Sequence, residues 1–217
     1  MHMQNKLKIT EIFHSIQGES TLSGERTSFV RLTGCPLRCS YCDTTYSFTG
    51  GEWMSVEEIV DVVRNHETKY VCITGGEPLS QKNCFDLVIA LKRLKINISI
   101  ETSGEKDVSA FLGNVKIVMD IKTPSSGEKT ELCFENLAYL LSSDEIKFVI
   151  SNRADYEWSK NICEKYDLVN RFKVLFSPVY NVLDLKTASE WILEDRLNVR
   201  LQTQLHKHIW GEEIRGV

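Results

Sequence analysis

The chain has 217 residues, 42% of them hydrophobic and 26% charged, a balance typical of a globular protein with one core. Its formal net charge of −4 provides no overall attraction to nucleic acid or to an anionic membrane, so neither partner is expected. No apolar run approaches the ~20 residues that span a bilayer, and the first residues lack the apolar segment of a secretion signal. We therefore expect a single cytoplasmic domain over residues 1–217.

Extended and helical patterns alternate along the chain. Strands are predicted at 6–13, 28–32, 70–74, 97–102, 115–121, 145–150, 171–176 and 197–203. Helices are predicted at 55–66, 80–95, 131–142, 153–166 and 184–195. Ser55 and Glu58 have the spacing of a capping box at the start of the first helix. A long irregular loop precedes that helix and extends to about Trp53.

Nearly continuous apolar strands that alternate with helices predict an α/β fold with a parallel sheet covered by helices. About six such units are too few to close an eight-fold barrel, so we expect a partial, open parallel β/α barrel. Active sites in such sheets lie at the carboxyl ends of the strands. Three polar segments, 75–78, 101–104 and 120–127, each follow a predicted strand and are candidate site segments.

Three closely spaced cysteines, Cys35, Cys39 and Cys42, form the pattern C-P-L-R-C-S-Y-C. Three thiolates can hold a cubane [4Fe–4S] cluster and leave its fourth iron open, whereas an electron-transfer cluster uses four cysteines. A zinc site completed by a distant His or Asp is the alternative from composition. The other four cysteines are scattered and are expected to be small buried side chains: Cys72, Cys84, Cys133 and Cys163.

The segment Gly75–Pro78, G-G-E-P, follows a predicted strand about 30 residues after the cysteines. Glycines allow close approach of the backbone to a ligand, and Glu77 offers an acceptor for an ammonium group. Together with the cysteines and Tyr41, this segment resembles the signature of the radical S-adenosylmethionine (radical SAM) superfamily. The resemblance implies the open barrel of that superfamily, with SAM bound at the open iron.

Further motifs narrow the resemblance. They are S-I-Q-G-E at 15–19, F-V-R-L-T-G-C at 29–35, C-D-T at 42–44 and E-T-S-G at 101–104. With G-G-E-P they resemble the 7-carboxy-7-deazaguanine synthase family over nearly the whole chain. The resemblance implies a lyase of queuosine (7-deazapurine) biosynthesis that contracts the ring of 6-carboxy-5,6,7,8-tetrahydropterin and loses ammonia. SAM would be recycled and Mg²⁺ required. A homodimer and an electron donor such as a flavodoxin or ferredoxin are implied too.

Carried over motif by motif, this resemblance implies four sets of site residues. The cluster ligands would be Cys35, Cys39 and Cys42, and the Mg²⁺ ligand would be Thr44. SAM would contact Tyr41, Cys42, Asp43, Gly76, Glu77, Ser103, Asp120, Ile121 and Lys122. The pterin would contact Ile16, Gln17, Gly18, Glu19, Arg31, Thr74, His206 and Val217.

Several of these residues have a plain structural alternative. Arg31 could be a surface arginine at a strand edge, and Thr44 could be an ordinary turn residue. Ser103 could cap a helix. Asp120 and Lys122 could pair with each other.

The end of the chain departs from the family pattern. In Q-T-Q-L-H-K-H, His206 is the better match to the family histidine and His208 is its rival, and both could be surface residues. The tail is also longer, which leaves open whether Val217 provides a terminal carboxylate contact. Two other functions stay open from the residues: a glycyl-radical-enzyme activase, and a cysteine-anchored metal-binding module.

Overall fold

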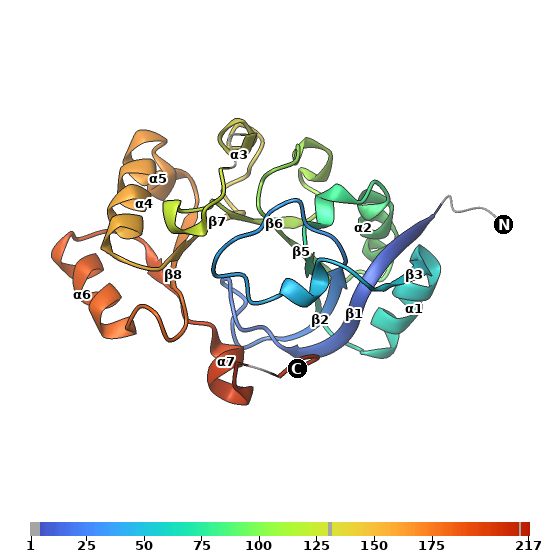
Figure 1. Ribbon diagram of the computed structural model, residues 1–217. Helices are drawn as coiled ribbons and strands as arrows, with labels where there is room; N and C mark the ends of the chain where they lie inside the picture. Colours follow the sequence, from blue (N-terminus) through green and yellow to red (C-terminus); the bar gives the residue numbers. More distant parts are fainter. Residues whose placement is uncertain (1–4, 130–131, 213) are drawn as a thin grey trace.

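The protein is described by a computed structural model that covers residues 5–129, 132–212 and 214–217. Its strands form one curved sheet, and the helices lie along the outside of the curve (Figure 1). In these residues the sheet has nine strands in the order β3-β1-β2-β4-β5-β6-β7-β8-β9. The two edge strands do not pair with each other, so the barrel is open, as predicted.

The bounds of the elements follow the chain order. The strands are β1 Lys6–Ile16, β2 Arg26–Leu32, β3 Glu52–Ser55, β4 Tyr70–Gly75, β5 Asn97–Thr102, β6 Lys116–Asp120, β7 Glu145–Ile150, β8 Lys173–Pro178 and β9 Arg200–Leu201. The helices are α1 Val56–Asn65, α2 Cys84–Lys92, α3 Leu132–Asn136, α4 Arg153–Lys165, α5 Leu168–Arg171, α6 Leu185–Glu194 and α7 Leu205–Trp210.

The sheet is parallel from β2 through β4 to β9, but β1 runs antiparallel to both of its neighbours. The predicted parallel sheet is confirmed from β2 onward, and the antiparallel pairs of β1 are an addition at one edge. The reason is that β1 and β2 are joined by a loop over 17–25, without the helical crossover that parallel pairing requires. A β-bulge in β1 shifts the register between Ile9, opposite Leu32, and Glu11, opposite Arg31.

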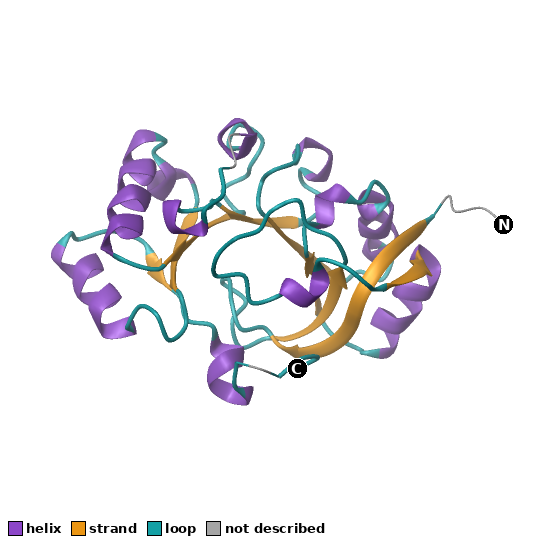
Figure 2. Ribbon diagram, viewed as in Figure 1, coloured by secondary structure: helices purple, strands orange, loops and turns teal. Residues whose placement is uncertain are grey.

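The local sequence accounts for the clearest elements. In α1, Ser55 accepts a hydrogen bond from Glu58 N and the Glu58 carboxylate accepts one from Ser55 N, which confirms the capping box. The same helix buries a stripe at helical spacing: Val56, Ile59, Val60 and Val63. The long loop that follows β2 and carries the cysteines lies inside the curve of the sheet (Figure 2).

Other elements differ from prediction in length or existence. The short strand β3 and the helices α5 and α7 were not predicted, because none carries a long apolar period. The predicted helix 80–95 is shorter, since a 3₁₀ turn at Pro78–Ser80 precedes α2. The predicted helix 131–142 is reduced to α3, and its residue 131 lies outside the described residues.

The hydrophobic core lies between the sheet and the helices and is continuous along the fold. All four scattered cysteines are buried, as predicted: Cys72, Cys84, Cys133 and Cys163. None of the helices in the described residues is long and apolar enough to cross a membrane.

Candidate active site

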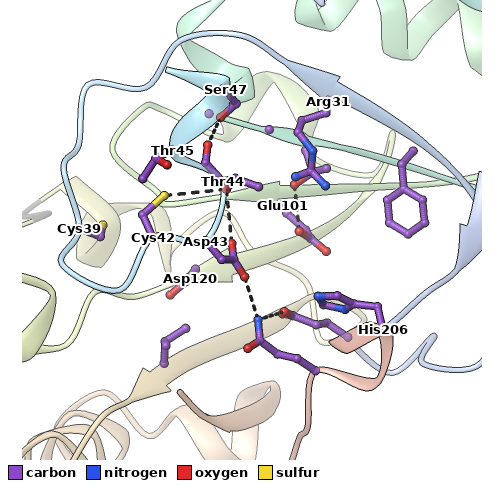
Figure 3. Close-up of a pocket in the computed structure, with 18 of the residues that line it drawn as sticks. Arg31, Cys39, Cys42, Asp43, Thr44, Thr45, Ser47, Glu101, Asp120 and His206 are labelled. Carbon is purple, nitrogen blue, oxygen red and sulfur yellow. Dashed lines mark hydrogen bonds between the residues drawn. The ribbon is translucent and has the colours of Figure 1, made fainter. Parts of the chain in front are cut away.

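A cavity of about 510 Å³ opens at the carboxyl ends of the strands, inside the curve of the sheet. Its walls come from β1, β2, the ends of β4 to β8, residues 17–19, the cysteine loop and the C-terminal segment. Figure 3 shows Arg31, Asp43, Thr44, Glu101 and His206 converging on this space. Of the predicted site residues, Glu77 and Ile121 do not line the cavity, and the others do.

Cys35, Cys39 and Cys42 all line the cavity and are partly exposed to it. The loop that carries them is held from outside by Ser40 N, which donates to Ser126 O at 3.0 Å, and by Arg38 N, which donates to Glu128 Oε1 at 2.6 Å. Within the described residues no three His, Cys, Asp or Glu side chains are placed to hold a single metal ion. Three thiols on one loop can each bind a different iron of a cluster.

The two glycines of G-G-E-P bring β4 against the start of the cysteine loop. A Cβ on Gly76 would lie 2.0 Å from Gly34 O, and a Cβ on Gly75, at φ +129°, would lie 2.3 Å from Leu32 O. Gly76 N donates to Leu32 O at 3.0 Å, and Glu77 N donates to Gly34 O at 2.8 Å. The close approach that glycine permits is therefore to the chain's own backbone, although Gly76 also borders the cavity.

Glu77 is buried and does not offer its carboxylate to a ligand. Oε1 accepts hydrogen bonds from Leu79 N at 3.1 Å and Thr102 Oγ1 at 2.8 Å. Oε2 accepts from Ser103 N at 2.8 Å and Ser103 Oγ at 2.7 Å. Four bonds fill the acceptor capacity of a carboxylate. Glu77 therefore holds the end of β5, and it holds Ser103, which is not a helix cap, in the cavity wall. A SAM contact by Glu77 stays a prediction.

Asp43 and Thr44 lie at the centre of the cavity wall (Figure 3). Asp43 Oδ2 forms an ion pair with Lys207 Nζ at 2.9 Å and accepts a hydrogen bond from Gln204 Nε2 at 3.2 Å. Lys207 on α7 and Gln204 just before it therefore bind the cysteine loop to the C-terminal segment. Burial raises the pKa of Asp43, but the Lys207 ammonium outweighs it, and the pKa lies below its usual value. Among the described residues, the Thr44 hydroxyl makes only long contacts, to Cys42 Sγ at 3.8 Å and Asp43 Oδ1 at 3.5 Å. It does not cap the following turn.

A buried chain of charges crosses the floor of the cavity. Lys147 on β7 pairs with Glu19 at 2.9 Å and lies 3.5 Å from Asp120 Oδ2, which Lys122 contacts at 3.0 Å. The Asp120–Lys122 pairing considered from the sequence therefore exists, yet both residues face the cavity. Asp120 Oδ1 is buried without a hydrogen-bond partner among the described residues, which leaves an acceptor for a ligand. The side chain of Ile121 packs in the core, and its SAM contact stays a prediction.

Arg31 on β2 is central in the sheet and faces the cavity, so it is not a surface arginine. Its Nε donates to Glu11 Oε1 at 2.7 Å, and Tyr46 Oη donates to the same oxygen at 2.8 Å. Next to it, Thr74 Oγ1 donates to Glu101 Oε2 at 3.0 Å. A cation and two polar acceptors thus lie on the wall formed by β2, β4 and β5.

The loop with Ile16, Gln17, Gly18 and Glu19 is fixed against the C-terminal segment. Leu205 N donates to Gly18 O at 3.0 Å, and a Cβ on Gly18 would lie 2.0 Å from His206 Nδ1. Glu19 accepts from Gln204 at 3.0 Å and from Gln202 at 3.2 Å. The loop could not approach α7 this closely with a larger residue at position 18.

The two candidate histidines are separated by the fold. His206 lines the cavity, whereas the exposed His208 points to Thr203 Oγ1, 2.8 Å away, and packs against Tyr180. Burial lowers the pKa of His206, against the opposing effect of Glu19 and Asp43, so its imidazole is neutral at pH 7. Val217 also lines the cavity, together with the rest of the described tail.

Sequence reasoning missed several polar residues of this site. Lys147 is the clearest example, and the sequence signal that could have identified it is a charged residue in the middle of the apolar run E-I-K-F-V-I. Two α7-side residues, Gln204 and Lys207, were missed too, and Glu101 was placed in a candidate segment without being named as a site residue. Their partners come from segments more than 25 positions away, which no local pattern reveals.

Comparison with known proteins assigns this site to a family. The Radical SAM superfamily model matches residues 29–167. The 7-carboxy-7-deazaguanine synthase of Chlorobaculum tepidum is 40% identical over 220 residues, with all of both chains covered. This chain belongs to the 7-carboxy-7-deazaguanine synthase family. The synthase of Koribacter versatilis is 42% identical and covers 97% of this chain and 100% of its own. The crystal structure of QueE from Escherichia coli superposes with a TM-score of 0.75 at 23% identity, over 93% of this chain and 95% of its own, and supports the fold.

Membership makes the protein a radical SAM enzyme, a lyase whose cofactors are a [4Fe–4S] cluster and SAM. The residues present fit both groups. Three thiols on one loop border the cavity, and the unpartnered Asp120 Oδ1 lies in the wall of the same cavity. The metal-binding module is thereby excluded, and the glycyl-radical-enzyme activase finds no support among these relatives.

Proposed function

We propose that this enzyme converts 6-carboxy-5,6,7,8-tetrahydropterin to 7-carboxy-7-deazaguanine with loss of ammonia, using SAM catalytically, in queuosine or another 7-deazapurine pathway. The observation that carries the proposal is Arg31, a guanidinium in the wall of the same cavity that the three cysteines border. A guanidinium with free terminal donors suits a carboxylate. Full-length relatives bear the name of the synthase for this product.

The cofactors would be held on the side of the cavity nearest the cysteine loop. Cys35, Cys39 and Cys42 would ligate the cluster, and SAM would lie against Tyr41, Asp43, Gly76, Ser103, Asp120 and Lys122. Cluster and SAM together supply, when bound, the radical that removes a hydrogen atom from the substrate. The chain contributes position: Asp120 Oδ1 accepts a hydrogen bond from the ligand, and Lys122 and Lys147 keep Asp120 ionised by lowering its pKa against the effect of burial.

The pterin would occupy the opposite side, between the loop 16–19, β2 and the start of α7. Arg31 would bind its carboxylate, with Thr74 and Val217 nearby. The neutral imidazole of His206 can donate one hydrogen bond and accept another. The tail and residues 17–19 line the cavity and would limit the access of water to the reacting carbon.

Thr44 would provide the protein ligand for Mg²⁺. Its hydroxyl borders the cavity and has only long contacts within the described residues, so it can turn to a cation. Mg²⁺ prefers oxygen ligands, keeps several waters and shares oxygens of its substrate. An ion held there would polarise the pterin oxygens that it contacts.

We also propose that residues 1–217 form one domain, that the enzyme is a cytoplasmic homodimer, and that a flavodoxin or ferredoxin reduces it. The continuous sheet and core support one domain. The buried thiols of Cys72, Cys84 and Cys163, none in a disulfide, fit a reducing compartment.

Replacement of Arg31 tests the substrate assignment. Arg31→Ala should lower kcat/KM for the carboxypterin roughly a hundred-fold, since a charged hydrogen-bonded contact of about 2–3 kcal/mol is lost. The visible absorption of the reconstituted cluster should not change. Arg26→Ala is the matched control, because Arg26 lies on the same strand but is exposed. Unchanged turnover in Arg31→Ala would remove Arg31 from the substrate site.

A further inference from the structure

Glu11 on β1 contacts Arg31 without bordering the cavity itself. Its Oε1 accepts hydrogen bonds from Arg31 Nε at 2.7 Å and from Tyr46 Oη at 2.8 Å. The Arg31 and Glu11 side chains are only 16% and 19% exposed. The contact is therefore a sheltered ion pair with a second donor, which is stronger than a typical surface pair.

The β-bulge in β1 creates this pairing. Ile9 is opposite Leu32, and an unbulged register would place Thr10 opposite Arg31 and Glu11 opposite Val30. Because successive strand residues face opposite sides of a sheet, the bulge at Thr10 turns Glu11 to the face that Arg31 occupies. Thr10 instead contacts Thr33 Oγ1 at 2.7 Å. The backbone irregularity thus has a defined consequence for one side chain of the candidate site.

The contact with Glu11 leaves the two terminal nitrogens of Arg31 available to bind a ligand. A guanidinium has five N–H donors, of which Nε carries one and the two terminal nitrogens carry four. Glu11 occupies Nε, and within the described residues no hydrogen bond from either terminal nitrogen is formed. Phe13 and Tyr46 each lie with the ring centroid 5.9 Å from Arg31 Cζ, which restricts the swing of the side chain. The two terminal nitrogens are left for a planar, bidentate partner.

We infer that Glu11 is a positioning residue that fixes Arg31 in the orientation needed to bind the carboxylate of the substrate. Fixing a long side chain before binding removes the entropic cost of ordering it afterwards. Tyr46 completes the arrangement, because its hydroxyl holds the shared Glu11 oxygen. This inference rests on the proposed function, in which Arg31 is the carboxylate-binding residue.

The test compares two replacements of Glu11 in the cluster-reconstituted enzyme. Glu11→Ala removes the acceptor, and Glu11→Gln keeps an oxygen that can accept from Nε and Tyr46. Glu11→Ala should raise KM for 6-carboxytetrahydropterin about ten-fold, as expected for loss of one charge-assisted hydrogen bond, with KM for SAM unchanged. Glu11→Gln should stay within about three-fold of wild type. Glu25→Ala is the control, since Glu25 is an exposed glutamate on the same hairpin.

A binding measurement separates positioning from a general structural role. Glu11→Ala should weaken binding of the carboxylated pterin but leave that of the same pterin without its carboxylate unchanged. Equal weakening of both pterins, or a Glu11→Gln loss as large as that of Glu11→Ala, would overturn the inference. If Glu11→Ala does not fold, Glu11→Met keeps the side-chain length and gives the same comparison. A normal KM in the Glu11 variants beside a defective Arg31→Ala would refute positioning and leave the proposed function intact. Normal kinetics in Arg31→Ala as well would remove Arg31 from the substrate site and refute the positioning role with it. Failure of the wild-type enzyme to turn over 6-carboxytetrahydropterin would refute the proposed function.

Discussion

Lys147 is the residue on which the buried charges of the site depend most. It is 11% exposed and lies between two carboxylates, 2.9 Å from Glu19 and 3.5 Å from Asp120. Removing one member of a buried ion pair typically costs 3–5 kcal/mol, because the remaining charge is left without compensation. Asp120 retains Lys122 at 3.0 Å, and Glu19 retains two glutamine amides. We therefore expect Lys147→Met to lower the free energy of unfolding by about 3 kcal/mol, the lower end of that range.

Urea unfolding of the cluster-free protein, followed by tryptophan fluorescence, measures this loss. With an m-value of about 3 kcal/mol/M, the midpoint should fall by about 1 M without a change in m. Lys186→Met is the control, since Lys186 is 82% exposed and its replacement should leave the midpoint nearly unchanged. A loss below about 1 kcal/mol for Lys147→Met would refute the reasoning that the charges are interdependent.

The pH dependence gives a second test of the same variant. In the wild type, burial raises the pKa of Glu19 and of Asp120. Lys147 outweighs this effect at Glu19, and Lys122 and Lys147 together outweigh it at Asp120, so the pKa of each carboxyl lies below its usual value. Their stabilising contribution is therefore present above the unfolded pKa of about 4 and is lost only as the pH falls through the lower folded values. Without Lys147, burial raises the pKa of Glu19, so protonation relieves part of the penalty. The stability gap between wild type and variant should narrow from pH 7.5 to pH 5, and a constant gap would contradict this account.

Three further predictions concern other walls of the cavity. Gly18→Ala should destabilise the protein by about 1–3 kcal/mol in urea unfolding, because its Cβ would lie 2.0 Å from His206 Nδ1; wild-type stability would contradict the packing. Burial lowers the pKa of His206 and of His66, so the unfolded state binds more protons and stability should fall as the pH drops below about 6.5. His206→Asn should reduce that fall and His66→Asn should remove another part of it, whereas unchanged pH profiles would show that folding lowers the pKa of neither histidine. Thr44→Ser, which keeps a hydroxyl, should retain more Mg²⁺-dependent activity than Thr44→Ala, and equal losses in a Mg²⁺ titration would argue against Thr44 as a ligand.

The sequence predicted the open barrel and most of the cavity wall because the signals there are local. The spacing of Cys35, Cys39 and Cys42 and the glycines after β4 lie within short segments, and the strand-end rule places such segments together. Glu77 shows the limit of this reasoning. A carboxylate in a site motif looked available for a ligand, but its four hydrogen-bond donors come from Leu79, Thr102 and Ser103.

The part that could not be predicted depends on contacts between distant segments. Lys147 meets Glu19 across 128 positions, and Gln204 meets Asp43 across 161. The bulge that places Glu11 opposite Arg31 leaves no mark in a single sequence, since it depends on how β1 pairs with β2. Arg31 itself was predictable from its motif, whereas the residues that hold it were not.

The most direct test of the proposed reaction counts product molecules per SAM. The reconstituted enzyme is incubated anaerobically with 6-carboxy-5,6,7,8-tetrahydropterin, Mg²⁺, a reductant and SAM at a small fraction of the pterin concentration, and the products are identified by mass. The proposal predicts 7-carboxy-7-deazaguanine in several-fold excess over the SAM supplied, with the SAM recovered intact. Consumption of SAM without a pterin-derived product of that mass would contradict it.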